Sequence, residues 1–220
     1  MTITVLMMRQ MKADCLTGKI LNIYKIIPST GVEGPGRRFC IWVQGCKKHC
    51  KGCFAKETWA FGTGKNYSTD ELWQSIRKEK NIEGITLLGG EPFEQAEALV
   101  ELTNKVKSAG LSVVCFTGNT IEELKTFQNP SVSQLLNNID LLIDGGFEQE
   151  NFDLSRPWVG SSNQRYIFLT DFYTPEDIKK FKNKIEVRIS DNGKLEINGM
   201  GNFEHFQKEF CLQLGKNDVK

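Results

Sequence analysis

The chain has 220 residues, of which 40% are hydrophobic and 25% carry a charge. This length suits one well-buried α/β domain and is too short for two full domains. Its 28 basic residues almost balance its 27 acidic ones, for a net charge of +1, so charge gives no reason to expect nucleic-acid binding. No apolar run approaches the length that crosses a membrane, and the first eleven residues show no cleavage-site pattern. Neither a membrane anchor nor a signal peptide is therefore expected.

The first predicted elements are strands. Residues 20–27 are apolar and branched, which predicts a strand that ends at Pro28. The glycine-rich residues 30–36 follow and are expected to form a loop that brings backbone near a ligand. Residues 39–43 are almost wholly apolar, as in a strand buried on both faces. Ligands collect at the carboxyl ends of such strands, so the next residues are the first candidate site.

Three cysteines follow this strand with the spacing C-x3-C-x2-C, at Cys46, Cys50 and Cys53. A cubane iron–sulfur cluster that only carries electrons takes four protein thiolates. Three thiolates this close in sequence hold three corners and leave one iron open to a substrate or cofactor. The spacing therefore indicates an iron–sulfur cluster that takes part in chemistry.

A structural zinc site is the alternative for this loop, because three thiolates and one imidazole are a known zinc ligand set. Zinc sites usually combine such a motif with a second, distant pair of ligands, and the sequence shows none. His49 also stands directly beside Cys50, where it reaches the same ion only awkwardly. We therefore favour the open cluster and interpret His49 as a solvated loop residue.

Strands and helices alternate after the cysteines. A capping box at Ser68 opens the first helix. The other predicted helices are residues 94–109, which place apolar side chains at helical spacing, and residues 121–139, which are broken at Pro130. The predicted strands are residues 84–88, 111–116 and 140–143. This alternation favours a parallel sheet with helical crossovers.

Polar turns follow the predicted strands. Residues 89–92, Gly-Gly-Glu-Pro, combine backbone that can approach a bound group, the carboxylate of Glu91 and a stiff proline. Alone they fit an ordinary strand-to-helix turn, but downstream of the cysteines they indicate a binding site. Thr117-Gly118 and Asp144-Gly145 end the next two strands and are expected to line the same mouth, with an ordinary turn as an equal alternative for Asp144.

The last part of the chain is expected to form an α+β extension. Residues 165–169 predict one more strand, Thr174 opens a helix, and residues 185–189 and 194–197 flank a hairpin turn. Residues 202–214 predict a closing helix. Its phenylalanine stripe, like Trp158, is interpreted as core. We expect a single domain over residues 1–220, with a core of about 18–170 and an extension of about 171–220.

The cysteine loop and the blocks after it resemble the radical S-adenosylmethionine (SAM) superfamily. Within that superfamily they are most similar to the activating proteins of anaerobic ribonucleoside-triphosphate reductase. The resemblance runs from about Val32 to about Leu169. The matching blocks are residues 34–38, 44–46, 50–53, 57–59, 89–92, 144–145 and 160–164.

The resemblance implies an α/β fold, a partial open (βα) barrel with mostly parallel strands. It implies a [4Fe-4S] cluster on Cys46, Cys50 and Cys53, with SAM bound to the fourth iron through its amino and carboxylate groups. Reductive cleavage of SAM then yields a 5′-deoxyadenosyl radical, which removes a hydrogen from a glycine of a large partner enzyme. The chain would thus be an oxidoreductase in which the cofactors do the chemistry, with no catalytic side chain beyond the cluster ligands.

The resemblance also implies residues that contact SAM. The turn at residues 89–91 meets the amino group, and the turn at 117–118 meets the ribose or the methionine carboxylate. Most of the superfamily has an aromatic residue before the third cysteine, but this chain has Gly52, as the reductase activators do, so backbone and Phe54 are expected to contact the adenine. The cofactor-binding residues are therefore Gly52, Cys53, Phe54, Gly89, Gly90, Glu91, Thr117 and Gly118.

Two other functions stay open at this point. One is a radical SAM enzyme that modifies a peptide or small metabolite, similar to 7-carboxy-7-deazaguanine synthase, with the extension as a lid. The other is a non-enzymatic iron–sulfur or zinc module. Expected partners are a glycyl-radical enzyme and a flavodoxin or ferredoxin-type electron donor, with no nucleic acid and no membrane.

The remaining charges and thiols around the site have simpler interpretations. Lys47, Lys48 and Lys51 are interpreted as a solvated run, with docking of an acidic electron donor as the alternative. The four other cysteines stand among apolar neighbours and are expected to be reduced core or incidental thiols. A reducing, anaerobic, cytoplasmic setting follows, because an oxygen-labile cluster needs it.

Overall fold

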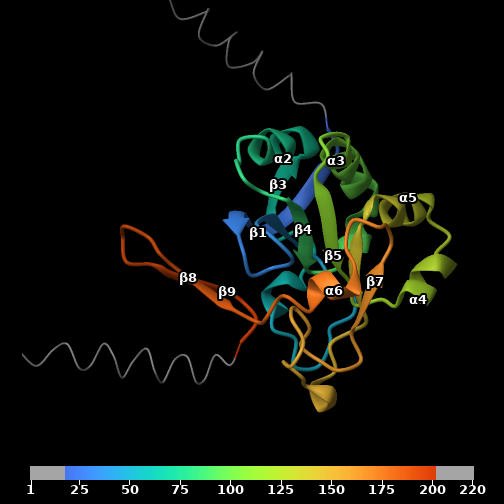
Figure 1. Ribbon diagram of the computed structural model, residues 1–220. Helices are drawn as coiled ribbons and strands as arrows, with labels where there is room; N and C mark the ends of the chain where they lie inside the picture. The colour runs from blue at the N-terminus through green and yellow to red at the C-terminus, as the bar shows by residue number, and fades with distance from the viewer. Residues whose placement is uncertain (1–17, 202–220) are drawn as a thin grey trace, which may run out of the picture.

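The computed structural model describes residues 18–201, whose centre is one seven-stranded sheet (Figure 1). The sheet order is β3-β1-β2-β4-β5-β6-β7. The four central strands, β2, β4, β5 and β6, pair in parallel, and β3, β1 and β7 add antiparallel strands at the two sides. The strands are β1 Ile20–Thr30, β2 Arg38–Val43, β3 Lys65–Ser68, β4 Gly84–Gly89, β5 Ser112–Phe116, β6 Leu141–Asp144 and β7 Arg165–Phe168.

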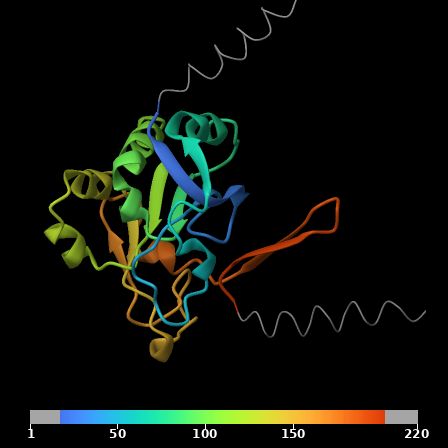
Figure 2. The ribbon, with the colours of Figure 1, turned by 180° about the vertical axis from the view of Figure 1, so that it is seen from behind.

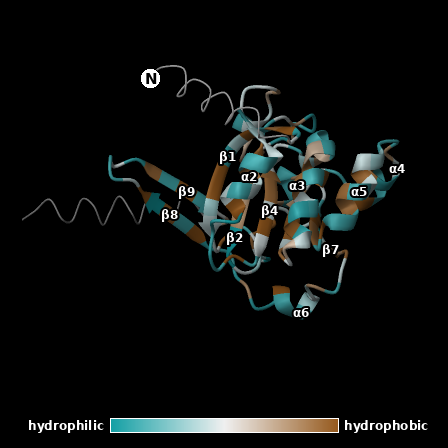
Figure 3. Ribbon diagram, turned by 90° about the horizontal axis from the view of Figure 1, so that it is seen from above, coloured by the Kyte–Doolittle hydropathy of each residue, from teal (hydrophilic) through white to brown (hydrophobic). Residues whose placement is uncertain are grey.

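Helices connect the parallel strands and cover one face of the sheet. They are α2 Thr69–Ile76, α3 Ala96–Ser108, α4 Ile121–Thr126 and α5 Pro130–Asn138, with short 3-10 turns at Lys56–Thr58, Pro92–Gln95 and Gln149–Asn151. Their apolar sides join the strands in one core, while α2 and α3 turn hydrophilic surface outward (Figure 3). Within residues 18–201, no helix combines the length and the apolar character that a membrane crossing requires.

The predicted alternation is confirmed. Ser68 makes the capping box with Glu71, and the predicted break at Pro130 separates α4 from α5. The apolar residues predicted to line the helix at 94–109 are all buried on α3: Ala98, Leu99, Leu102 and Val106. The coarser fold class, α/β with parallel central strands, is therefore correct.

Two local expectations are wrong, and one strand was missed. β1 continues through Pro28 to Thr30, because β3 pairs only with Ile20–Ile23 and the register to β2 is irregular between Ile27 and Thr30. Proline is tolerated where no ladder partner needs its missing N–H. The strand β3 was not predicted at all. Finally, the glycine-rich loop at 31–37 joins the end of β1 to the start of β2. It therefore lies at the amino end of β2, whereas the cysteines follow its carboxyl end, and it does not bring backbone to the cysteine loop.

A buried arginine holds the amino ends of the parallel strands together. Arg38 has no exposed surface and donates to Thr86 Oγ1 at 2.8 Å, to Ile85 O at 2.6 Å and to Tyr173 OH at 2.8 Å. Tyr173 in turn donates to Glu83 Oε1 at 2.5 Å. A guanidinium has five donors, so its burial is tolerable only when most of them are satisfied in this way.

The extension follows β7 and contains α6 Pro175–Ile178 and a hairpin of β8 Ile185–Ile189 and β9 Leu195–Gly199. The hairpin confirms the predicted turn and extends away from the sheet, on the side opposite α4 and α5 (Figures 1 and 2). Its root is held by Glu33, whose Oε1 accepts from Asn198 Nδ2 at 3.0 Å and from Gly199 N at 2.8 Å. Burial raises the pKa of Glu33 from 4.5 to about 6. The predicted helix at 202–214 and its phenylalanines lie outside the described residues; Trp158 is buried, as expected.

Candidate active site

The cysteine loop begins at the carboxyl end of β2 and is closed by a buried glutamine. Gln44 Nε2 donates to Glu57 O at 3.0 Å and to Ala60 O at 2.6 Å. The backbone adds Gly45 N to Thr58 O at 2.7 Å and Cys46 N to Trp59 O at 3.1 Å. These bonds fix both ends of the loop, so the three cysteines are presented from a rigid base.

Cys46, Cys50 and Cys53 are free thiols, each partly exposed. Cys40 and Cys115 are free too, but both are fully buried, which raises their thiol pKa values far above the ordinary range. Only thiolates bind iron, so these two are inert core residues, as predicted. The other two cysteines, Cys15 and Cys211, lie outside the described residues. Among residues 18–201, no three His, Cys, Asp or Glu side chains are already gathered around a single metal-ion position.

The ends of the neighbouring strands lie very close to this loop. At the end of β4, Gly90 N donates to Val43 O at 2.8 Å and Glu91 N donates to Gly45 O at 2.9 Å. A Cβ on Gly90 would lie 2.4 Å from Gly45 O, so no other residue fits there. At the end of β6, a Cβ on Gly146 would lie 3.4 Å from Cys50 Sγ and 3.5 Å from the Gly118 carbonyl oxygen. Three thiols on one loop, with Cys50 Sγ next to the glycine backbone at the end of β6, are a donor set and a cradle that fit a cluster with an attached ligand.

Glu91 joins the ends of β4 and β5. It is 3% exposed, and its two oxygens accept from Thr117 Oγ1 at 2.9 and 3.0 Å, from Gly118 N at 2.9 Å and from Phe93 N at 3.1 Å. Burial raises its carboxyl pKa from 4.5 to about 7, against the lowering effect of these donors. The structure thus brings together three of the predicted SAM-contact residues, Glu91, Thr117 and Gly118, through the carboxylate itself.

Gly52 and Phe54 lie in a different environment from Glu91. The Phe54 ring is 61% exposed and packs edge-on against Phe147 with centroids 5.2 Å apart, and Phe152 lies 6.4 Å away. A Cβ on Gly52 would meet Gln149 Oε1 at 2.9 Å. These residues therefore form an aromatic rim with the loop that follows β6, which their sequence positions did not indicate.

Asp144 has a structural role in this arrangement. It is fully buried, and it accepts from Arg165 Nε at 2.9 Å, from Arg165 Nη2 at 2.6 Å and from Ile121 N at 2.8 Å. These bonds tie β6 to β7 and to the start of α4. The sequence left a ligand contact and an ordinary turn open for this residue, and the contacts show how its carboxylate serves the fold.

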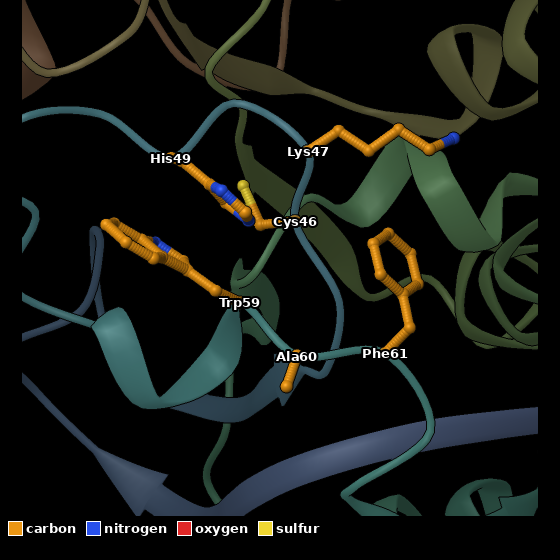
Figure 4. A pocket seen from close by; sticks show the side chains of 6 residues that line it. All are labelled: Cys46, Lys47, His49, Trp59, Ala60 and Phe61. Carbon is orange, nitrogen blue, oxygen red and sulfur yellow. The ribbon is translucent and has the colours of Figure 1, made fainter.

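A pocket of about 450 Å³ lies between the start of the cysteine loop and residues 59–61 (Figure 4). It is lined by Cys46, Lys47, His49, Trp59, Ala60 and Phe61. His49 stacks on Trp59 with ring centroids 4.5 Å apart, so it is an ordered rather than a purely solvated side chain.

Each lysine of the loop has a carboxylate partner. Lys47 pairs with Glu94 at 2.6 Å, Lys48 with Glu123 at 3.3 Å and Lys51 with Glu150 at 2.9 Å. The positive run in the sequence is therefore locally neutralised, and exposed pairs of this kind contribute little to stability.

Comparisons with known proteins identify the family. A family model described as a 4Fe-4S single cluster domain matches residues 32–167. The anaerobic ribonucleoside-triphosphate reductase-activating protein of Vibrio cholerae is 36% identical over 153 residues, which are 66% of this chain and 96% of that protein. The chain belongs to this family of activating proteins. It is accordingly a radical SAM enzyme with a [4Fe-4S] cluster and SAM as cofactors, and the resemblance seen in the sequence is confirmed.

Other members of the family are equally well covered. The activating protein of Escherichia coli K12 is 30% identical over 152 residues, 66% of this chain and 96% of that protein. That of Enterobacteria phage T4 is 31% identical over 157 residues, 69% of this chain and 96% of that protein.

Among solved structures, that of QueE from Escherichia coli has a TM-score of 0.39 and 22% identity to this chain. The match covers 46% of this chain and 54% of that one.

Proposed function

We propose that this chain activates an anaerobic ribonucleoside-triphosphate reductase by installing a glycyl radical on it. The observation that carries the proposal is the cysteine triplet at the carboxyl end of β2, in a chain whose family members are named for this activation. When bound, the [4Fe-4S] cluster and SAM supply a 5′-deoxyadenosyl radical, the species that abstracts hydrogen from the partner's glycine.

The chain's own residues bind and orient these groups. Cys46, Cys50 and Cys53 hold three irons, and their free, partly exposed thiols support that role. Gly89, Gly90 and Glu91 meet the amino group of SAM. The closeness of this turn to Gly45, at the start of the cysteine loop, supports the assignment.

Two further regions complete the proposed SAM site. Thr117 and Gly118 are held by Glu91 at the end of β5, where they line the ribose or the carboxylate. Gly52 and Phe54 contact the adenine from the aromatic rim. No side chain of the chain acts as a general acid or base, since the reaction moves a hydrogen atom and depends on position.

The described extension supports a large partner rather than a small enclosed substrate. A lid over a small metabolite would have to cover the carboxyl ends of the parallel strands, where the cysteine loop lies. The hairpin instead is rooted on Glu33, with Arg188 Nη2 donating to Ser29 O at 3.1 Å, at the other end. Among residues 18–201 the hairpin thus does not cover the cysteine loop, so we favour a glycine-bearing loop of another protein as the substrate over a small metabolite.

The finer architecture and setting are part of the same proposal. We propose that the sheet belongs to a partial, open barrel of the radical SAM type, with residues 1–220 as one domain. We place the reaction in the anaerobic cytoplasm. A flavodoxin or ferredoxin-type protein donates the electron. Docking of this donor on Lys47, Lys48 and Lys51 is the alternative to a solvated run, and a reduction rate that does not change with salt concentration would contradict it.

The test is anaerobic reconstitution with iron and sulfide, reduction with dithionite, and measurement of 5′-deoxyadenosine formed from SAM. Addition of an anaerobic ribonucleotide reductase should raise product formation and produce a glycyl-radical signal in electron paramagnetic resonance. Product without any glycyl radical would point to another substrate. A chain that binds zinc and assembles no iron–sulfur cluster would overturn the assignment.

A further inference from the structure

The polar loop at residues 160–164 has no task in the function proposed above, although the structure shows what holds it. Gln164 Oε1 accepts from Gly160 N at 2.8 Å, and Gln164 Nε2 donates to Gly145 O at 3.2 Å. Arg156 donates to the carbonyl oxygens of Ser161 and Gln164 at 3.1 and 3.0 Å. The loop is therefore a rigid support for the turn that ends β6.

Asn163 is the member of this loop with an unmet hydrogen-bonding group. Its Nδ2 donates to Gly146 O at 2.8 Å. This bond fixes the orientation of the amide, because the flipped amide would place two oxygens against each other. Within residues 18–201, Asn163 Oδ1 is the one buried side-chain oxygen or nitrogen without a hydrogen-bond partner.

A buried acceptor of this kind lowers the stability of the fold, because its oxygen has lost the hydrogen bonds to water and has gained none from a protein donor. Buried polar groups in native proteins nearly always have a partner, so an isolated exception calls for a water molecule or a ligand as that partner. The partner must be a hydrogen-bond donor. A neutral amide oxygen suits a hydroxyl or an amino group.

The position of Asn163 indicates which ligand carries that donor. Gly146, to which it is bonded, faces Cys50 Sγ and the Gly118 carbonyl oxygen, at 3.4 and 3.5 Å from the position of a Cβ. Asn163 is thus attached to the residue that lies between the cysteine loop and the end of β5. Any ligand bound between these two elements lies next to the Gly145-Gly146 turn.

We propose that Asn163 is a SAM-binding residue whose Oδ1 accepts a hydrogen bond from the nucleoside part of SAM, a ribose hydroxyl or the adenine amino group. This inference rests on the proposed function, which places SAM at the same edge. It places the ammonium group of SAM at the turn containing Glu91, after β4. It places the nucleoside at the turn containing Gly146, after β6. The loop at 160–164 then holds both the turn and the acceptor in place.

The test compares Asn163→Ala with Asn163→Asp in the reconstituted protein, with Asn138→Ala as a remote control. Asn138 Nδ2 bonds to Thr103 Oγ1 at 3.0 Å and Asn104 Oδ1 at 2.8 Å on the helical face, so its loss leaves the site intact. Affinity is measured by anaerobic equilibrium dialysis for SAM, 5′-methylthioadenosine and methionine. The rise in melting temperature on adding SAM gives a second readout that needs no turnover.

Asn163→Ala should weaken binding of SAM and of 5′-methylthioadenosine roughly tenfold, the loss of about one hydrogen bond, and leave methionine binding unchanged. Asn163→Asp keeps an acceptor and loses the donor to Gly146, so it should bind the nucleoside better than the alanine variant does. Equal losses for Ala and Asp, equal losses for both halves of SAM, or no loss at all would overturn the inference. Wild-type protein that binds no SAM would instead refute the proposed function, so the two failures are distinguishable.

Discussion

Replacing Glu91 by alanine should destabilise the fold and weaken SAM binding without removing iron. The substitution leaves the N–H groups of Phe93 and Gly118 without their acceptor, and the Thr117 hydroxyl loses its partner as well. Each buried donor left unpaired costs about 1–3 kcal/mol. Water can enter and satisfy some of these donors, so we expect the free energy of unfolding to fall by about 3 kcal/mol. For a chain of this size, that lowers the melting temperature by about 6–12 °C.

The assay measures thermal unfolding, iron per chain and SAM affinity in parallel. Iron should stay at the wild-type level, because Glu91 bonds to the ends of β4 and β5 and not to a cysteine. Cys40→Ala is a suitable control, since it also alters a buried residue of the central sheet, on β2, and Cys40 makes no hydrogen bond to Glu91 or Thr117. Unchanged melting would refute the bridging role, and a loss of iron equal to the loss of SAM binding would show that Glu91 supports the cluster loop as well.

The same carboxylate predicts a pH dependence of stability. Its pKa is about 7 in the folded state against 4.5 ordinarily, so the folded state holds the proton more tightly than the unfolded state does. Glu91 therefore favours folding most below about pH 4.5, and this contribution, about 3 kcal/mol in full, is lost as the pH rises towards 7. Glu91→Gln mimics the neutral form and cannot titrate, so the stability difference between wild type and this variant should change across that window. A difference independent of pH would contradict the raised pKa, and Glu33, present in both proteins, cancels in the comparison.

Three further outcomes are expected. Cys46→Ala should abolish assembly of the open [4Fe-4S] cluster, measured as iron per chain, whereas Cys115→Ala should assemble it normally; activity in the first variant would contradict the ligand assignment. Arg38→Met should lower the free energy of unfolding by about 3 kcal/mol or more in denaturant titrations, because it leaves several buried acceptors unpaired, and a neutral effect would show that water replaces the guanidinium. Glu33→Ala should speed proteolysis of the hairpin β8–β9 while 5′-deoxyadenosine formation continues, and protection equal to wild type would show that other contacts hold the hairpin.

The sequence alone predicted the elements whose signals are local. The apolar run before the cysteines, the capping box at Ser68 and the hairpin turn at Asp191-Asn192-Gly193 each depend on neighbouring residues, so their patterns are visible without a fold. The cysteine spacing also needs no tertiary information, because all three candidate ligands stand on one loop, and this spacing favoured an open iron–sulfur cluster over a zinc site.

Only the tertiary structure decided which distant residues meet. The glycine-rich loop has the composition of a ligand-binding loop, yet it precedes β2 and so lies at the opposite end of that strand from the cysteines. No local sequence pattern predicts this placement. Glu91 shows the same limit: the sequence marks it as a site residue, but only the approach of β5 turns its carboxylate towards Thr117 and Gly118. Asn163 lies in a block that matches the family, but the sequence assigns it no contact. Its meaning comes from a bond to Gly146, 17 residues away, and from a buried oxygen that the folded chain leaves without a donor.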